Sequence, residues 1–455
     1  MAKATTSPAT IFALASGGGR AGVAVIRVSG PLAGAALAGV MGKGGKSSDT
    51  LPRRAVYTPL YDPEGGDGLD DGLVIWFPGP ASFTGEDVAE FHVHGGPAVI
   101  AGVLEALSRM EGLRLAEPGE FTRRAFENGK MDLTAAEGLA DLIEAETAAQ
   151  RKQALRQLEG ELGRVYEAWR ERLLSALSHS EAAIDFSDED LPDTIVAAAA
   201  AEIASLEQEI VAHLTDKRRG ERLRDGCLIA IIGPPNAGKS SLLNCLARRD
   251  AAIVSEVAGT TRDVIEVHLD LGGYPVTVAD TAGLRDGGDA IEVEGIRRAR
   301  RKAEDSDLRL AVFDGVAWPD ADPSTLGLVD VDTLVVINKC DLAKPTPPLE
   351  VAGQPALAVS ALTGDGIDTL LAAAAERVGA MMDVGGSPAL TRTRHREALE
   401  ECRDALARYL GGPGLSPELA AEDLRLAARA LGRITGRVDV DDILDVIFRD
   451  FCIGK

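Results

Sequence analysis

The spacing of hydrophobic positions changes three times along the chain, and each change predicts a different kind of structure. In the first part, short apolar runs at strand spacing occur at residues 22–28, 72–77 and 88–93. Residues 97–110 instead place their apolar side chains on one face of a helix. Residues 1–128 therefore predict a mixed α/β domain.

After about Met131 the composition shifts to helix formers, with apolar residues three or four positions apart. The residues of this stripe are Leu155, Leu158, Leu162, Val165, Trp169, Leu173 and Ala176. Their spacing predicts one long helix that contributes to the core of a bundle. A second, alanine-rich helix is predicted to end near Leu214. The chain turns helical again from about residue 388, and Ser416-Pro417 is typical of a helix start.

Between these two helical stretches, the continuous apolar run at 228–232 predicts a buried parallel strand, and two further, mainly apolar segments lie at 276–279 and 335–337. Because a complete α/β domain stands between the helical stretches, we infer that they pack together and that this domain is inserted between them. The predicted fold class is multidomain, α/β plus all-α. Its domains are an N-terminal α/β domain (1–128), a helical domain (129–220 and 383–455) and an inserted domain (221–382).

The charge of the chain limits the partners that it can hold by itself. With 48 basic and 71 acidic residues the net charge is −23, which argues against a broad surface that grips nucleic acid. A local basic patch or a basic partner stays open. No stretch has the length and apolar character of a signal peptide or a membrane span, so we expect a soluble, cytoplasmic protein.

Neither cysteines nor histidines indicate a structural metal site. The five cysteines are widely spaced and form no C-x-x-C pair, which is typical of a reducing compartment. His92 and His94 project to the same side of a strand, but no further ligands are apparent. We therefore expect packing or hydrogen bonding for this pair.

Residues 233–241, Gly-Pro-Pro-Asn-Ala-Gly-Lys-Ser-Ser, match the phosphate-binding pattern G-x-x-x-x-G-K-[ST] between a predicted strand and a predicted helix. Gly233 and Gly238 let the backbone curl so that its N–H groups face an anion. Lys239 can reach the β- and γ-phosphates, and the Ser240 hydroxyl can ligate Mg²⁺. The alternative, a glycine-rich turn with a solvated lysine, would not explain this context.

The motifs that follow occur in the order of a GTP-binding domain. Thr261 can complete the Mg²⁺ shell, Asp280 ends a strand where it can hold the metal through water, and the Gly283 N–H can sense the γ-phosphate. Asp341 can accept hydrogen bonds from N1–H and N2–H₂ of guanine, a donor pair that adenine lacks. Residues 360–362 are predicted to close the base pocket.

The motifs alone leave open which residue orients the attacking water. Many GTPases use a glutamine directly after the D-x-x-G motif, and this chain has Leu284 there. Glu292 and Glu294 are candidates for the role, and two solvated acids on an exposed turn are the alternative.

The whole chain resembles the MnmE (TrmE) family of tRNA-modifying GTPases. The motifs that carry the resemblance are residues 25–31, 77–87, 118–121 and 128–133, the phosphate loop, 280–285 and the final Cys452-Ile453-Gly454-Lys455. The last motif is specific, because a generic GTPase has no reason to end in this way.

For GTP hydrolysis, the resemblance implies a homodimer through the N-terminal domains and a K⁺ ion in place of an arginine finger. The implied K⁺ ligands are Asn236, Ser255, Val257 and Thr260, and Glu292 is the implied catalytic residue instead of Glu294. Motifs and resemblance together assign GTP contacts to Asn236, Ala237, Gly238, Lys239, Ser240, Ser241, Ser255, Glu256, Val257, Ala258, Gly259, Thr260, Thr261, Asp280, Thr281, Ala282, Gly283, Asn338, Lys339, Asp341, Ser360, Ala361 and Leu362.

The resemblance also implies a formylated tetrahydrofolate bound by Arg27, Glu90, Lys130 and Lys455. With a flavin-bearing partner, MnmG, the family installs a carboxymethylaminomethyl or aminomethyl group on the wobble uridine of certain tRNAs. The competing hypothesis is a GTP-gated assembly switch without tRNA chemistry. Such a switch would need neither the N-terminal domain nor the final motif.

Overall fold

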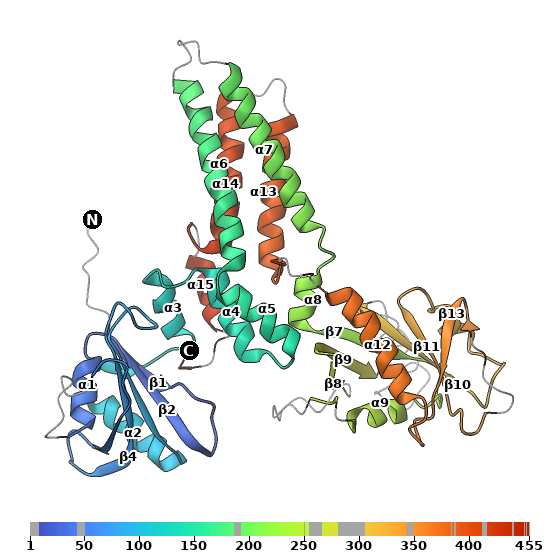
Figure 1. The fold of residues 1–455 in the computed structure, drawn as a ribbon, viewed down its shortest axis with the longest axis horizontal. Helices are drawn as coiled ribbons and strands as arrows, with labels where there is room; N and C mark the ends of the chain where they lie inside the picture. Colours follow the sequence, from blue (N-terminus) through green and yellow to red (C-terminus); the bar gives the residue numbers. More distant parts are fainter. Residues whose placement is uncertain are drawn as a thin grey trace, which may run out of the picture. The chain divides into compact units, whose positions relative to one another are not determined.

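The computed structural model describes residues 9–42, 51–185, 193–249, 251–253, 266–280, 305–343, 348, 350–383, 385, 388–411, 416–438, 441–449, 451 and 453–454. The chain divides into two compact units. The first comprises residues 1–140, 163–170 and 429–455, and the second comprises residues 141–162 and 171–428. Figure 1 shows the elements of both.

The first unit is built on a six-stranded sheet with the order β3-β4-β5-β2-β1-β6. Its strands are β1 (Thr10–Leu14), β2 (Ala21–Ser29), β3 (Val56–Tyr61), β4 (Gly68–Phe77), β5 (Val88–Gly95) and β6 (Leu113–Leu115). All neighbouring strands are antiparallel except β1 and β6. The helices that begin in this unit are α1 (Ala33–Val40), α2 (Pro97–Arg109), α3 (Glu120–Glu127), α4 (Leu133–Glu144) and α15 (Asp441–Arg449).

Side-chain alternation along β2 gives the sheet one covered and one less covered face. Ala24, Ile26 and Val28 are buried and pack with α1 and α2 in one apolar cluster. Val25 and Arg27 point to the opposite face and are only half-buried. The predicted strands and the helix at 97–110 are confirmed, and Arg27 lies on the face that α1 and α2 leave uncovered.

The end of the chain returns to this same unit. Phe448 of α15 and Phe451 pack with Leu133 of α4 in a separate apolar cluster. Ile453 then forms an antiparallel bridge with Pro118, and Gly454 is buried against the backbone at Leu14. Gly454 has φ of +101°, and a Cβ there would lie too close to the Leu14 carbonyl oxygen. Gly454 is therefore fitted closely to a strand of the sheet that carries Arg27.

The second unit contains a seven-stranded sheet with the order β12-β13-β11-β10-β7-β9-β8. Its strands are β7 (Cys227–Ile232), β8 (Glu266–Leu271), β9 (Tyr274–Asp280), β10 (Leu308–Asp314), β11 (Thr333–Asn338), β12 (Glu350–Val351) and β13 (Gln354–Ala358). The five inner strands are parallel, and the edge strands β8 and β12 are antiparallel to their neighbours. The helices that lie wholly within this unit are α5 (Ala148–Leu158), α7 (Asp193–Leu214), α8 (Arg219–Asp225), α9 (Lys239–Ala247), α11 (Pro323–Leu326), α12 (Ile367–Met382) and α13 (Thr393–Gly411). Two long helices, α6 (Glu161–Asp185) and α14 (Pro417–Thr435), supply residues to both units.

The prediction of one long helix through Leu155 and Ala176 is wrong. Helix α5 ends at Leu158, and α6 begins at Glu161. Gly160 stands between them with φ of +79°, a left-handed conformation that no α-helix interior contains. The apolar spacing continues across the break, which is why the pattern alone did not reveal it.

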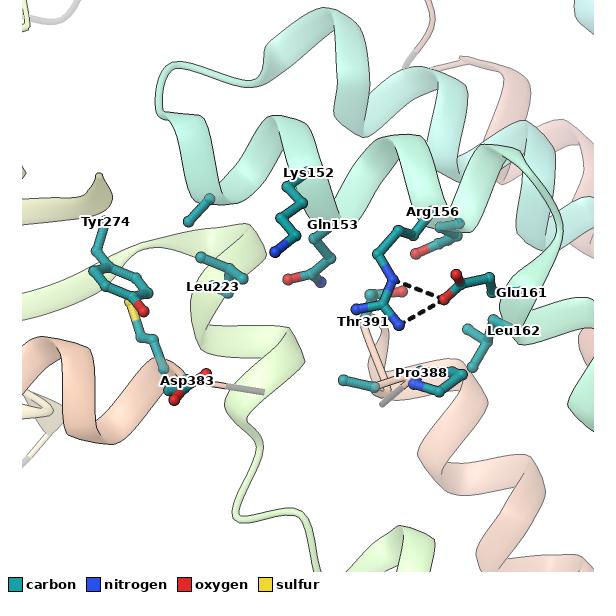
Figure 2. A pocket seen from close by; sticks show the side chains of 14 residues that line it. Lys152, Gln153, Arg156, Glu161, Leu162, Leu223, Tyr274, Asp383, Pro388 and Thr391 are labelled. Carbon is teal, nitrogen blue, oxygen red and sulfur yellow. Dashed lines mark hydrogen bonds and ion pairs between the residues drawn. The ribbon is translucent and has the colours of Figure 1, made fainter. Parts of the chain in front are cut away.

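A small cavity lies among α5, α8, β9 and residues 382–391 of the second unit. It has a volume of about 130 Å³ and is walled by both apolar and polar side chains. Figure 2 shows Lys152, Gln153 and Arg156 facing it from α5, with Arg156 paired to Glu161 at 2.7 Å. None of the described residues that line it belongs to the predicted nucleotide or folate contacts.

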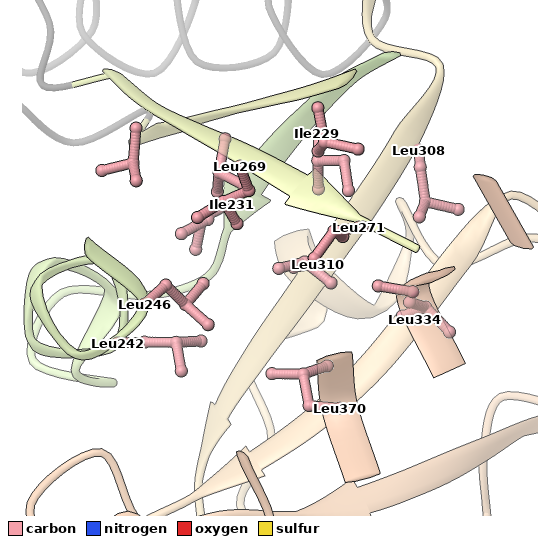
Figure 3. Close-up of a cluster of buried hydrophobic side chains, with 14 of the residues drawn as sticks. Ile229, Ile231, Leu242, Leu246, Leu269, Leu271, Leu308, Leu310, Leu334 and Leu370 are labelled. Atoms are coloured by element: carbon pink, nitrogen blue, oxygen red, sulfur yellow. The ribbon is translucent and has the colours of Figure 1, made fainter. Parts of the chain in front are cut away.

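The seven-stranded sheet has an apolar core on each face. Ile229 and Ile231 of β7 pack with Leu242 and Leu246 of α9 and with Leu370 of α12 (Figure 3). The alternating residues of β7, Ala230 and Ile232, belong to a second cluster on the other face. Strands buried on both faces explain the continuous apolar runs of the sequence.

Two further expectations can be compared with the described residues. His92 contacts Glu90 at 3.2 Å and His94 contacts Asp70 at 2.8 Å, so both histidines are hydrogen-bonded as expected. In the part of the chain that the structure describes, no three or more histidine, cysteine, aspartate or glutamate side chains come together as a metal site. Likewise, no described helix has the length and apolar character needed to cross a membrane.

Candidate functional site

The loop between β7 and α9 has the curled backbone that its two glycines predict. Gly233 has φ of +151° and Gly238, the N-cap of α9, has φ of +93°. A Cβ at Gly233 would overlap the Val312 carbonyl oxygen, and one at Gly238 would overlap the Asn338 side chain. Asn236 also has positive φ, at +64°. This backbone presents the start of α9, with its N–H groups and positive dipole end, at the carboxyl end of β7.

Lys239 lies inside this loop. Its side chain is buried, and Nζ donates to the carbonyl oxygens of Gly233 and Pro234, each at 2.8 Å. Burial lowers the pKa of Lys239, while Asp280 and Asp322 partly offset that effect by favouring the ammonium form. The ammonium is thus positioned within the loop where a phosphate chain would bind.

The two groups predicted to bind Mg²⁺ that the structure describes, Ser240 and Asp280, lie together. Residues Ile231 and Asp280 are register partners on the adjacent parallel strands β7 and β9. The Ser240 hydroxyl donates to the Asp280 carboxylate at 2.8 Å, and Asp280 is buried. A hydroxyl and a carboxylate suit Mg²⁺, which prefers hard oxygen ligands and keeps several waters. These residues therefore fit the predicted ion.

Asn338 connects the phosphate loop to the predicted base pocket. It is buried at the end of β11, and its side-chain nitrogen donates to the Ala237 carbonyl at 2.9 Å. Its side-chain oxygen accepts from the Ala361 N–H at 3.0 Å. Ser360 is buried beside it, whereas Leu362 is exposed. One amide thus holds two binding loops in a common geometry.

Lys339 and Asp341 complete the described base side. Lys339 has φ of +63°, and its ammonium pairs with Asp314 at the end of β10 at 2.7 Å. Burial raises the pKa of Asp314, but hydrogen bonds from Lys339 and the Val316 N–H outweigh it and leave the pKa below its usual value. Asp341 is exposed to solvent, as a carboxylate that receives a ligand must be. Asp314 was missed by the sequence reasoning, although its position directly after the buried strand β10 was a usable signal.

The remaining nucleotide contacts lie outside the described residues. They are Ser255, Glu256, Val257, Ala258, Gly259, Thr260, Thr261, Thr281, Ala282 and Gly283, and the predicted catalytic residue Glu292 lies outside the described residues too. Their predicted roles stay predictions.

A variant of Gly238 tests the geometry of the phosphate loop. Gly238→Ala is expected to weaken GTP binding at least 10-fold, because the methyl group must displace Asn338 and disfavours a φ of +93°. Isothermal titration calorimetry with GTP measures this. The control is Gly353→Ala, at a turn where φ is +79° but nothing lies within 4 Å of the added Cβ. Equal GTP affinities of the two variants would contradict the proposed crowding.

In the first unit, Arg27 and Glu90 are register partners on β2 and β5 and form an ion pair at 2.9 Å. The rings of Phe83 and Phe121 lie 5.5 and 5.8 Å from the Arg27 guanidinium. His92 contacts the other oxygen of Glu90. Neither ring was predicted from the sequence, although each lies in one of the motifs that carry the family resemblance. This cluster combines a cation, an anion and aromatic surface on the less covered sheet face.

The other two predicted folate contacts are less defined. Lys130 is exposed, and its Nζ donates to the Pro80 carbonyl at 3.0 Å. Lys455 lies outside the described residues. Its neighbour Gly454 is placed against Leu14, and β1 pairs with β2 so that Ala13 faces Arg27. Gly454 thus lies beside the strand pair that carries Arg27.

Comparisons with known proteins extend over the whole chain. The family model described as "GTP-binding protein TrmE N-terminus" matches residues 10–130, and the model described as "MnmE helical domain" matches residues 133–452. A curated protein of Paramagnetospirillum magneticum, "tRNA modification GTPase MnmE", is 59% identical over 446 residues, which cover 98% of this chain and 99% of that protein. The chain belongs to the MnmE family. This membership confirms the resemblance and the predicted fold class.

Relatives in this family extend beyond bacteria. The human mitochondrial "5-taurinomethyluridine-[tRNA] synthase subunit GTPB3" is 50% identical over 473 residues, covering 100% of this chain and 95% of that protein. Among solved structures, the G domain of the T. maritima FeoB iron transporter matches with 24% identity and a TM-score of 0.25, covering 34% of this chain and 98% of that one. At this TM-score the structural likeness carries no argument, and the assignment to the MnmE family depends on sequence.

Proposed function

We propose that this chain is a GTP hydrolase that binds GTP with Mg²⁺ and acts in tRNA modification. The observation that carries the proposal is the arrangement of side chains at the carboxyl-terminal ends of the parallel strands. There Lys239, the Ser240–Asp280 pair and Asn338 lie at the carboxyl ends of β7, β9 and β11. Binding sites of open α/β sheets form at these strand ends. The tRNA part of the proposal is supported by two relatives, a tRNA modification GTPase and a subunit of a tRNA 5-taurinomethyluridine synthase.

For the hydrolytic step, we propose that Glu292 orients the attacking water and that a K⁺ ion stabilises the developing charge. Asn236, Ser255, Val257 and Thr260 would hold the ion, and the positive-φ backbone at Asn236 supports a loop residue aimed at the phosphates. A monovalent cation beside the β- and γ-phosphates acts as an arginine finger does. The side chain of Leu284 cannot orient water, so another residue must.

For the one-carbon donor, we propose a formylated tetrahydrofolate at Arg27, Glu90, Lys130 and Lys455. The Glu90 carboxylate can accept from the donor edge of a pterin ring, and Arg27 and the lysines can bind carboxylates. The half-buried Arg27–Glu90 pair between two aromatic rings supports this site. Folate would bring the one-carbon unit, and this chain would bind and orient it.

The remaining elements of the proposal concern assembly. We propose a cytoplasmic homodimer that works with a flavin-bearing partner, MnmG, on the C5 position of the wobble uridine. The net charge of −23 supports a partner that supplies the basic surface for tRNA. We also propose the domain boundaries 1–128, 129–220 with 383–455, and 221–382.

The experiment that tests this function is mass spectrometry of wobble nucleosides in tRNA from a host that lacks the chain. Expression of the wild-type chain is expected to restore the modified uridines. With Glu292→Gln, we expect the modified uridines to form at no more than about 1% of the initial rate seen with the wild type. The reason is that a water-orienting group accelerates hydrolysis roughly 10²-fold or more. The matched control Glu294→Gln, two residues away, should restore the modified uridines fully.

Two results would contradict the proposal in different ways. Unchanged nucleosides with and without the chain would favour the GTP-gated assembly switch. Full restoration by Glu292→Gln at the wild-type rate would leave tRNA modification standing and remove Glu292 from the hydrolytic step.

A further inference from the structure

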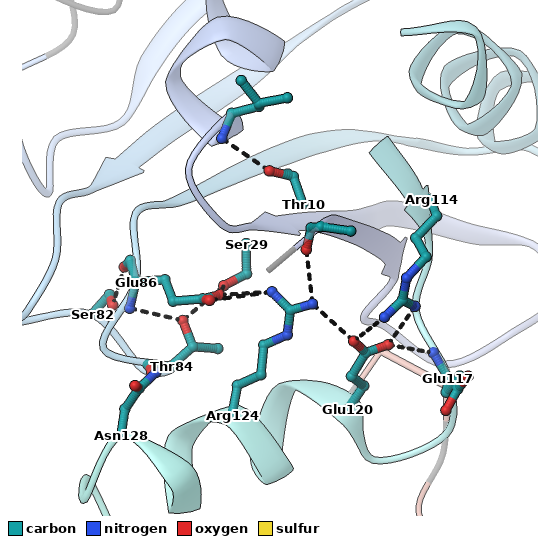
Figure 4. A network of polar contacts seen from close by, with 12 residues as sticks. Thr10, Ser29, Ser82, Thr84, Glu86, Arg114, Glu117, Glu120, Arg124 and Asn128 are labelled. Carbon is teal, nitrogen blue, oxygen red and sulfur yellow. Dashed lines mark hydrogen bonds and ion pairs between the residues drawn. The ribbon is translucent and has the colours of Figure 1, made fainter. Parts of the chain in front are cut away.

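Arg124 ties helix α3 to the loop at residues 78–87 that follows β4. It is almost fully buried, and its Nη1 donates to both carboxylate oxygens of Glu86 at 3.0 and 3.2 Å. Its Nη2 donates to Glu120 and to the Ala9 carbonyl, each at 2.8 Å. Figure 4 shows the guanidinium between the two carboxylates. Because the planar guanidinium group donates hydrogen bonds to the loop and to α3 at the same time, it fixes these two elements relative to each other.

The loop end of this contact is itself part of a dense network. Glu86 accepts from the Ser29 hydroxyl at 2.7 Å, and Ser29 lies 2.7 Å from the Thr84 hydroxyl (Figure 4). Ser29 and Thr84 are both buried. Ser29 is two residues after Arg27 on β2, so both side chains project to the same face of the sheet. The network therefore lies next to the Arg27–Glu90 pair.

The two elements that Arg124 joins each carry one of the rings at Arg27. Phe83 belongs to the loop, three residues before Glu86, and Phe121 belongs to α3, one helical turn before Arg124. The separation of the two rings around the guanidinium thus depends on the distance between loop and helix. The Arg124–Glu86 contact fixes that distance at the level of the two rings, while Asn128, the C-cap of α3, ties the end of the helix to the Thr84 carbonyl at 2.8 Å.

We infer that Arg124 and Glu86 are positioning residues for the ligand site at Arg27 and Glu90. They hold the Phe83 ring against the Arg27 guanidinium. The guanidinium thereby keeps the orientation in which it can bind an anionic, aromatic ligand. The inference rests on the proposed folate function for the identity of that ligand. Neither residue is assigned a contact with the ligand itself.

Removal of Arg124 alone also has a structural cost that must be separated from positioning. It leaves the half-buried Glu86 carboxylate without its charged partner, which destabilises the fold. Replacement of both Arg124 and Glu86 by apolar residues of similar size is often neutral for stability, because neither leaves an unpaired charge and Glu120 keeps its ion pair with Arg114. A double variant therefore separates the two roles.

The experiment measures binding of 5-formyltetrahydrofolate by calorimetry to the full-length chain and to the double variant Arg124→Met/Glu86→Leu. The double variant is expected to keep the melting temperature of the wild type within a few degrees but to bind about 10- to 100-fold more weakly, as is typical when supporting residues of a binding group are removed. Hydrogen exchange of peptides that cover residues 78–87 is expected to accelerate in the same variant. The single variant Arg124→Met should show the same weak binding with a lowered melting temperature.

The matched control is Arg114→Met. Arg114 pairs with the same Glu120 at 2.6 Å, but its side chain is 45% exposed and it makes no described contact with the loop. Binding and loop exchange are expected to stay at wild-type values.

Three results would overturn the inference, and they are distinguishable. Wild-type affinity in the double variant would show that the network serves stability alone. Unchanged exchange at residues 78–87 would show that Arg124 does not hold the loop, whatever the ligand. A wild-type chain that does not bind 5-formyltetrahydrofolate, with exchange responding as expected, would instead remove the proposed folate function and leave Arg124 as the residue that holds the loop.

Discussion

Lys239→Ala is expected to lower kcat/KM for GTP by roughly 10²- to 10³-fold, the cost of removing one preorganised cation from a phosphoryl-transfer site. The Lys239 ammonium donates to two carbonyl oxygens of its own loop. These hydrogen bonds hold the cation inside the phosphate loop, which is the preorganisation that the variant removes. Steady-state phosphate release from GTP measures the effect.

The loss should not be a consequence of unfolding. Burial disfavours the charged form of Lys239, as its lowered pKa indicates, so replacing it by alanine removes a desolvation cost together with two hydrogen bonds. We expect a melting temperature close to that of the wild type without nucleotide. Lys152→Ala, at an exposed position on α5, is the matched control and should hydrolyse GTP normally. Normal turnover by Lys239→Ala would contradict the assignment of this loop as the phosphate site.

Asp341→Asn is expected to reduce GTP affinity about 10³-fold and to create affinity for xanthosine triphosphate. A carboxylate accepts from both N1–H and N2–H₂ of guanine, whereas an amide turns one of its two acceptors into a donor. Xanthine has a carbonyl oxygen where guanine has N2–H₂, so it matches the amide. In the variant, the N2–H₂ donor of guanine faces the NH₂ donor of the amide, and both are left without an acceptor. This mismatch costs about 4 kcal/mol of binding free energy, which corresponds to the expected loss of GTP affinity.

Competition between the two nucleotides measures this change of specificity directly. Asp341 is exposed and follows the rigidly held Asn338–Lys339 pair, so the substitution changes the ligand contact without disturbing packing. Asp320→Asn, another exposed aspartate of the same unit, is the matched control and should not alter the preference. A variant that binds GTP as tightly as the wild type would show that another group reads the base.

The features that the sequence predicted well are those that depend on local order of residues. The phosphate loop is an example, because Gly233 and Gly238 occupy positions where a Cβ would collide with Val312 or Asn338. The end of β9 at Asp280 is another, since a buried apolar run led directly to it. In both places the residue type and the neighbouring pattern already contained the constraint.

The features that were missed depend on contacts between distant residues or on a single conformational detail. Asn338 holds the carbonyl of Ala237, 101 residues earlier, and a motif match says nothing of that tie. Arg124 reaches Glu86 across 38 residues and Ala9 across 115. The break at Gly160 depends on the left-handed conformation of one residue, while the helical spacing of apolar residues continues on both sides of it. Such features require the fold, because sequence spacing does not encode which side chains meet.

The placement of Ile453 and Gly454 against Pro118 and Leu14 has a consequence for the order of events during translation. The strands of the first sheet leave the ribosome early, but the residues that cover β1 are synthesised more than 320 positions later. At roughly 5–20 residues per second, that interval lasts on the order of 15–65 s. The nascent N-terminal sheet must therefore wait, without these contacts, until residues 453 and 454 have been synthesised.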